Sequence, residues 1–126
     1  MQEHIQNELA SFIANCDWEK IAPHFKEDAA YRVLDWIGCA VAGEHYPQVE
    51  IAQKYFIENG DQGNSTVIGH QTKCSPRTAA FLNGIAGHVC ELDDGHRTAI
   101  GHPGSIAVPT ALALGEHLNA SGADVL

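Results

Sequence analysis

The sequence has few basic residues and no long apolar run, and both shortages exclude classes of function. Lysine and arginine together number 7 against 16 aspartate and glutamate residues, which gives a formal net charge of −9. This acidic excess argues against nucleic acid or an anionic membrane surface as a partner, although it does not exclude a small anionic substrate. No apolar run approaches the roughly 18 residues that a membrane-spanning helix requires.

Recognisable cysteine, signal and nucleotide motifs are also missing. The four cysteines include no C-x-x-C pair, and the N-terminus lacks the basic start and apolar core of a signal peptide. Neither G-x-G-x-x-G nor G-x-x-x-x-G-K-S/T occurs, which argues against nucleotide binding. We therefore predict a cytoplasmic protein in which Cys16, Cys39 and Cys90 are small buried hydrophobic residues rather than disulfide partners.

What the sequence does contain is helical periodicity along most of its length. A first helix is marked by one apolar face, made of Ile5, Leu9, Phe12 and Ile13. Further helices are predicted at about residues 26–42, 47–60, 76–92 and 106–118, and residues 66–69 form either one short strand or an extended link. On the helix predicted at 26–42 the apolar stripe consists of Ala30, Val33, Leu34, Ile37 and Val41. These segments predict a single all-α domain, a bundle of about five helices.

Proline and serine mark the helix boundaries. Pro23 interrupts the stretch before the second helix, whereas Ser75 followed by Pro76 is typical of an N-cap and a first helical position. Ser121 and Asp124 fit a capping box at the start of a sixth helix, which the chain barely enters. This last signal predicts that the chain is the N-terminal piece of something longer.

The helix predicted at 76–92 has one face of very small side chains that leads to two titratable groups. Ala80, Gly84, Gly87, His88 and Glu91 fall within about 100° of one another on a helical wheel. Interior glycine costs roughly 1 kcal/mol relative to alanine, so two glycines on one face indicate close packing against another helix. This argument leaves both a structural and a functional role open for His88.

A dense polar stretch follows this helix and lies between two apolar segments. Its chemistry-bearing residues are Glu91, Asp93, Asp94, His96, Arg97 and Thr98, followed by His102 before a proline. Because adjacent residues do not share a helix face, only one of the paired aspartates is expected to point into a site. Arg97 could clamp a carboxylate, and backbone N–H groups near Ser105 could bind an anion at the start of the next helix. The pattern fits proton abstraction beside a carboxylate, as in a lyase, dehydratase or epimerase.

Two other functions compete with this interpretation. A metal site could draw on His88, Glu91, Asp93, Asp94, His96 and His102, but neither H-E-x-x-H nor C-x-x-C occurs, so we rank metal binding below proton chemistry and assign no metal. The other alternative is a non-catalytic helical module that associates with another chain. The apolar helix faces and the glycine-lined helix favour such association.

Several segments together resemble the MmgE/PrpD family, which includes 2-methylcitrate dehydratase, cis-aconitate decarboxylase and an iminodisuccinate epimerase. The matching text is L-D-W-I-G-C-A-V-A-G at 34–43, T-V-I-G at 66–69, A-A-F-L-N-G-I-A-G-H at 79–88, E-L-D-D at 91–94, H-P-G at 102–104 and P-T-A-L-A-L at 109–114. The resemblance spans nearly the whole chain and is most specific between residues 79 and 114. It implies that residues 1–126 are part of a large helical domain and that the family's smaller α/β lid domain is absent.

The resemblance also implies a chemistry and a set of site residues. Members of the family act on small di- or tricarboxylates by proton abstraction and elimination, need no organic cofactor and are usually homodimers. Glu91 takes the place of the family's first acid, which is usually aspartate, and Asp93, Asp94 and His102 match the rest of the motif. These four are the predicted catalytic residues. The predicted substrate-binding residues are His88, His96, Arg97 and Ser105.

The chain departs from the family pattern in two places near these residues. Gly95 stands where a threonine often follows the acids, and the spacing from Asp94 to His102 is longer than in decarboxylase-like members. The family's second histidine and its lysines lie further along and are missing from this sequence. We therefore predict that the 126-residue polypeptide is inactive by itself.

Overall fold

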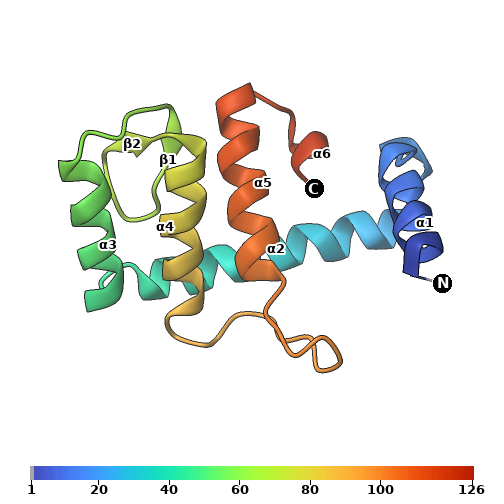
Figure 1. Cartoon of the computed structure of the whole chain (residues 1–126), viewed down its shortest axis with the longest axis horizontal. Coiled ribbons are helices and arrows are strands. Elements are labelled where there is room, and N and C mark those ends of the chain that lie inside the picture. Colours follow the sequence, from blue (N-terminus) through green and yellow to red (C-terminus); the bar gives the residue numbers. More distant parts are fainter. Residues whose placement is uncertain (1) are drawn as a thin grey trace.

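The fold is a set of helices that cross one long helix. The computed structural model describes residues 2–126. Its elements are α1 (Gln2–Ala14), a 3-10 turn (Trp18–Lys20), α2 (Pro23–Gly43), α3 (Pro47–Glu58), β1 (Ser65–Thr66), β2 (Lys73–Cys74), α4 (Pro76–His88), α5 (Gly104–Leu118) and α6 (Gly122–Val125). Helix α2 runs across the molecule, while α4 and α5 stand side by side across it (Figure 1). The prediction of an all-α architecture is confirmed.

Helix starts follow the local chemistry of proline and serine. Pro23 and Pro47 occupy the first turns of α2 and α3, so Pro23 begins a helix rather than interrupting one. The Ser75 side chain accepts the N–H of Thr78 at the start of α4, as predicted. The capping box predicted at the start of α6 is also present in full.

The glycine-lined face of α4 packs closely, as predicted. A Cβ atom built on Gly87 would lie 2.6 Å from the indole of Trp36 on α2. One built on Gly84 would lie 3.1 Å from the Ser105 carbonyl oxygen on α5. Trp36 is 2% exposed and joins Ala40, Val49 and Ala86 in a core cluster. A second cluster, nearer the start of α4, contains Val67, Cys74, Ala79, Leu82 and Ala113.

The buried face of α2 differs from the predicted apolar stripe. Leu34 and Val41 from that stripe are 64% and 52% exposed, and Val33 and Ile37 are only partly buried. The buried residues of α2 are instead Trp36, Cys39, Ala40 and Gly43. The reason is the close approach of α4, which requires small residues and a flat indole at the crossing. The apolar face of α1 is likewise exposed at Ile5, Leu9, Phe12 and Ile13.

The cysteines fit the predicted role of small buried residues only in part. Cys39 and Cys74 are buried and Cys90 is half-buried, but Cys16 is exposed, which contradicts the prediction for that residue. All four thiols are free. Cys16 follows the last turn of α1, whose apolar face finds no cover, and this explains its exposure.

A two-stranded antiparallel ribbon replaces the predicted strand or link at 66–69. Strand β1 pairs with β2 so that Ser65 faces Cys74 and Thr66 faces Lys73. Helix α5 holds this ribbon through Glu116, whose carboxylate accepts from the backbone N–H of Thr66 at 2.6 Å and pairs with Lys73 Nζ at 2.5 Å. Within residues 2–126 no helix combines the length and apolar character needed to cross a membrane.

Candidate functional site

The segment between α4 and α5 carries six of the predicted site residues, and it begins earlier than the sequence indicates; His88 ends α4 and Ser105 lies in the first turn of α5. Helix α4 ends at His88, not near residue 92. Glu91 adopts a left-handed backbone conformation with φ of 50°, and its N–H donates to the His88 carbonyl oxygen at 2.8 Å. This turn takes Glu91 off the helix face that it was predicted to share with His88. No glycine or proline signals the helix end, so the sequence pattern could not reveal it.

Three predicted site residues lie on the exposed part of this segment. The backbone folds back on itself where the N–H of His96 donates to the Gly101 carbonyl oxygen at 2.9 Å. His96, Arg97 and Glu91 are all exposed. The His96 ring accepts the N–H of Ala99 through Nδ1 at 3.0 Å, which stabilises the turn. The side chains of these three residues form no hydrogen bond or ion pair with the cluster of titratable side chains described next.

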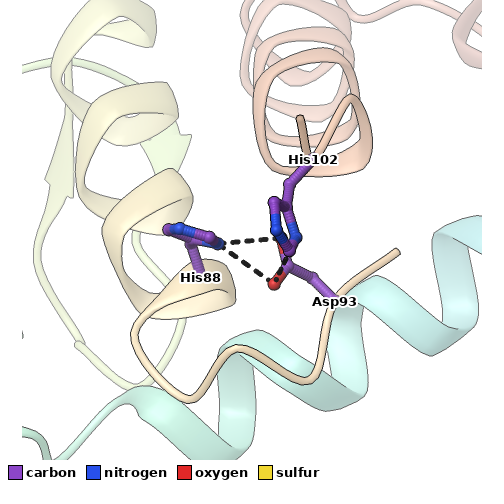
Figure 2. Close-up of side chains that lie close together, drawn as sticks. All are labelled: His88, Asp93 and His102. Atoms are coloured by element: carbon purple, nitrogen blue, oxygen red, sulfur yellow. Dashed lines mark hydrogen bonds and ion pairs between the residues drawn. The ribbon is translucent and has the colours of Figure 1, made fainter. Parts of the chain in front are cut away.

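Two imidazoles converge on the buried carboxylate of Asp93. The Nδ1 atom of His88, at the end of α4, lies 3.1 Å from both carboxylate oxygens. The Nδ1 atom of His102 lies 3.3 Å from Oδ1 and comes from the segment that leads into α5 (Figure 2). The Asp93 side chain is fully buried, whereas the His88 and His102 side chains are 46% and 37% exposed. The two rings thus connect a buried charge with the surface.

A second set of hydrogen bonds fixes the Asp93 carboxylate from behind. Ser105, in the first turn of α5, donates its hydroxyl proton to Asp93 Oδ2. The Ser105 oxygen in turn accepts the indole N–H of Trp36 at 3.3 Å. The chain of contacts therefore runs from α2 through α5 to the site. Trp36 lies 69 residues before Ser105, so no local spacing in the sequence could have identified its part in the site.

Asp93 is ionised at neutral pH despite its burial. Burial raises the pKa of this carboxyl. The hydrogen bonds from Ser105 and His88 and the electrostatic attraction of the two imidazoles lower the pKa by more than burial raises it, so the pKa lies below its usual value. A buried carboxylate needs such partners because an uncompensated charge in the interior is costly. His102 Nδ1, although close to the carboxylate, is buried without a hydrogen-bond partner.

Asp94 points away from this cluster, as expected for one member of an adjacent pair. Its Oδ1 atom accepts the backbone N–H of Gly104 at 2.8 Å and so caps the start of α5. A Cβ atom on Gly104 would overlap Oδ1 of Asp94, so a larger residue there would displace this carboxylate. The helix start that was predicted to bind an anion is therefore already paired with a carboxylate of this chain.

A groove of about 630 Å³ adjoins the cluster. His88, His102 and Ser105 line one part of it. Ala80 and Gly84 of the predicted small-residue face line another part, and the remaining walls are largely apolar. The groove thus offers room for a small molecule beside the two imidazoles.

The six predicted metal-ligand residues do not all lie together. In residues 2–126 only His88, Asp93 and His102 bring ligand atoms within 4.8 Å of one another.

The amino-acid sequence of this chain is similar to those of known proteins. The chain is 31% identical over 113 residues to the cis-aconitate decarboxylase-like protein oryM of Aspergillus oryzae, a match that covers 90% of this chain and 23% of that protein. It is 33% identical over 99 residues to the cis-aconitate decarboxylase of Homo sapiens, covering 75% of this chain and 20% of that enzyme. The chain therefore spans a quarter or less of the length of these relatives. Because residues 7–126 match the MmgE/PrpD N-terminal domain, the chain belongs to the MmgE/PrpD family.

Proposed function

We propose that this chain supplies one wall of an acid–base site for small di- or tricarboxylates. The reaction would be a dehydration or an epimerisation that begins with removal of a proton from carbon, or a decarboxylation in which the bond to CO2 breaks and a carbon takes up a proton. The observation that carries the proposal is the ionised, buried Asp93 carboxylate held between the half-exposed His88 and His102 rings. The two similar proteins named for cis-aconitate decarboxylation add support for the substrate class.

In this proposal His88 is the proton acceptor and Asp93 orients it. The Nδ1–H group of His88 donates a hydrogen bond to the Asp93 carboxylate. This hydrogen bond selects the neutral tautomer of His88, which has a lone pair on Nε2. When Nε2 takes up a proton, the ring becomes cationic, and the adjacent carboxylate stabilises that charge. His102 faces the same carboxylate and is placed to return a proton or to contact the substrate. Ser105 keeps the carboxylate in position.

The remaining predicted residues serve the rim of the site in this proposal. Arg97 and His96 provide positive or neutral donors on the exposed segment, where a substrate carboxylate could bind them. Glu91 is exposed beside them and keeps a role only if the substrate reaches beyond the groove. Asp94 acts on the site indirectly by capping the helix that carries Ser105.

The 126-residue polypeptide is proposed to bind a tricarboxylate weakly and not to turn it over. Imidazole resonances can be followed by NMR while cis-aconitate is added to the labelled chain. We expect shifts at His88 and His102 and none at His45, whose side chain is 84% exposed and pairs with Glu44. The absence of any shift at millimolar ligand would reject the proposed wall. Robust decarboxylation or hydration that disappears in Asp93→Asn would reject the proposed inactivity.

A helical association module is the second candidate function. The observation that favours it is the exposure of Ile5, Leu9, Phe12 and Ile13, each at least 58% exposed on one face of α1. Apolar faces of this kind mark protein contacts in soluble proteins. Sedimentation velocity tests this candidate, because it requires a homodimer or a larger species. A chain that stays monomeric at all measured concentrations would reject it.

A further inference from the structure

The cluster at the end of α4 combines three side chains that commonly ligate metal ions. One ligand atom from each of His88, Asp93 and His102 lies within 4.8 Å of the others. Two imidazoles and one carboxylate are a common protein ligand set for Zn²⁺ and related divalent ions, with a further position left for water or a small ligand. The three residues come from the end of α4 and from the segment before α5, so helix packing holds them together.

An unpartnered nitrogen points to a missing ligand at the same place. Nδ1 of His102 is buried and has no hydrogen-bond partner, although it lies 3.3 Å from Asp93 Oδ1. Buried polar atoms are almost always paired with a donor, an acceptor or an ion. A cation between the imidazole and the carboxylate would satisfy this nitrogen. It would also neutralise part of the buried charge of Asp93.

The surroundings of Asp93 resemble the support that metal-binding carboxylates usually have. Ser105 donates to Oδ2, whereas Oδ1 lies 3.1 Å from Nδ1 of His88 and 3.3 Å from Nδ1 of His102. Trp36 in turn fixes Ser105. Hydrogen bonds of this kind orient ligands and raise metal affinity. The adjoining groove, lined in part by His88 and His102, gives an ion a path to the site.

We propose that His88, Asp93 and His102 form a binding site for a divalent transition-metal ion, with Zn²⁺ as the best chemical match. Zinc lies about 2.0–2.2 Å from nitrogen and oxygen ligands in tetrahedral geometry, so two of its ligands are about 3.3–3.6 Å apart. Ligand atoms that lie up to 4.8 Å apart must therefore close by about 1 Å. The two half-exposed rings can make that movement by side-chain rotation. The site uses the residues of the proposed proton transfer but does not depend on that function.

Isothermal titration of the chelator-treated chain with Zn²⁺ tests the proposal without any substrate. We expect one saturable site per chain. The ligand variants His88→Gln, His102→Gln and Asp93→Asn should each weaken binding by about tenfold or more, a loss at least as large as that seen when supporting residues are removed. The control His45→Gln should leave the affinity unchanged, because His45 is a surface histidine paired only with Glu44.

Two further measurements keep the test decisive if a variant fails to fold. Circular dichroism reports whether each variant keeps its helices. Imidazole NMR of the unsubstituted chain needs no variant, and Zn²⁺ should shift His88 and His102 before any other histidine. Binding that shifts other histidines first, or that is absent, would overturn the proposal. Cobalt binding with thiolate charge-transfer absorption would also overturn it, because the four free cysteines would then be the ligands.

These outcomes separate this proposal from the proposed carboxylate site. A chain that binds Zn²⁺ at His88 and His102 but shows no response to cis-aconitate supports the metal site alone. A chain that responds to cis-aconitate but binds no metal supports the acid–base site alone. Competition between Zn²⁺ and cis-aconitate, or mutual enhancement, would then define how the two share the cluster.

Discussion

Replacing Gly87 with alanine should destabilise the fold, although alanine is the better helix former. Gly87 faces the indole of Trp36, and a Cβ atom there would lie 2.6 Å from Nε1 and Cε2 of the ring. Carbon atoms in contact prefer separations of about 3.5–4.0 Å, so the ring must move by roughly 1 Å. Trp36 is only 2% exposed and packs in a core cluster, so little free space accepts that movement.

The expected magnitude follows from opposing terms. Overfilling a packed core costs about 1–3 kcal/mol. Loss of the Trp36–Ser105 hydrogen bond, which is 3.3 Å long, adds about 1 kcal/mol. Alanine returns at most about 1 kcal/mol of helix propensity, and less at Gly87 because the helix ends one residue later. We therefore expect Gly87→Ala to lower the free energy of unfolding by about 1–3 kcal/mol.

Gly38 provides the matched control. It lies in the interior of α2, and a Cβ atom there would meet nothing within 4 Å. Gly38→Ala should therefore stabilise the chain by roughly 0.5–1 kcal/mol through helix propensity alone. Urea unfolding followed by circular dichroism measures both variants, and tryptophan fluorescence reports the environment of Trp36 directly. The two midpoints should move in opposite directions.

The reasoning fails if both alanine variants are stabilised equally. That outcome would mean that the α2–α4 crossing relaxes freely around Gly87. A destabilisation of Gly87→Ala with unchanged imidazole resonances of His88 would be a different result. It would keep the packing argument but reject the link from Trp36 through Ser105 to the site.

Three further predictions concern carboxylates. Because the folded pKa of Asp93 lies below its unfolded value of about 3.9, its stabilisation is complete above that pH and is lost as the pH falls through the folded pKa. Asp93→Asn should therefore flatten the acid limb of a plot of urea midpoint against pH. Glu116→Gln should cost about 1 kcal/mol in urea unfolding by releasing Thr66 and Lys73, whereas exposed Glu50→Gln should change stability by less than about 0.5 kcal/mol. Asp94→Ala should uncap α5 and lower the unfolding free energy by about 0.5–2 kcal/mol, measured in the same way.

The helix starts could be predicted from the sequence because their causes are local. Ser75 is the N-cap of α4 and Pro76 occupies its first turn, so two adjacent residues mark this helix start. The capping box of α6 is formed by Ser121 and Asp124, which are three residues apart. The buried face of α2 could not be predicted, since both of its faces carry apolar residues. Contact with Gly87 selects the face that bears Trp36, and that contact joins residues far apart in the chain.

The candidate site shows the same division between local and distant causes. His88, Asp93, His102 and Ser105 are all among the residues predicted for the site, and they meet in one cluster, although Ser105 takes part through its hydroxyl and not through the predicted backbone N–H. Glu91 was expected beside them because the helix was extended past its true end at His88. A single left-handed residue moved it to the surface. Trp36 was missed because a tryptophan on a helix carries no signal for a partner on another helix.

The position of Asp93 makes the fold and the candidate site inseparable. Its carboxylate is held by a residue from α4 and by one from α5, and α2 reaches it through Trp36. Any shift of these three helices therefore changes the distances between the carboxylate and the two imidazoles. Both proposed functions depend on those distances, since a proton acceptor needs an oriented ring and a metal ion needs ligands about 2 Å away. The two glycines of α4 influence these distances, because they set how closely α4 approaches α2 and α5.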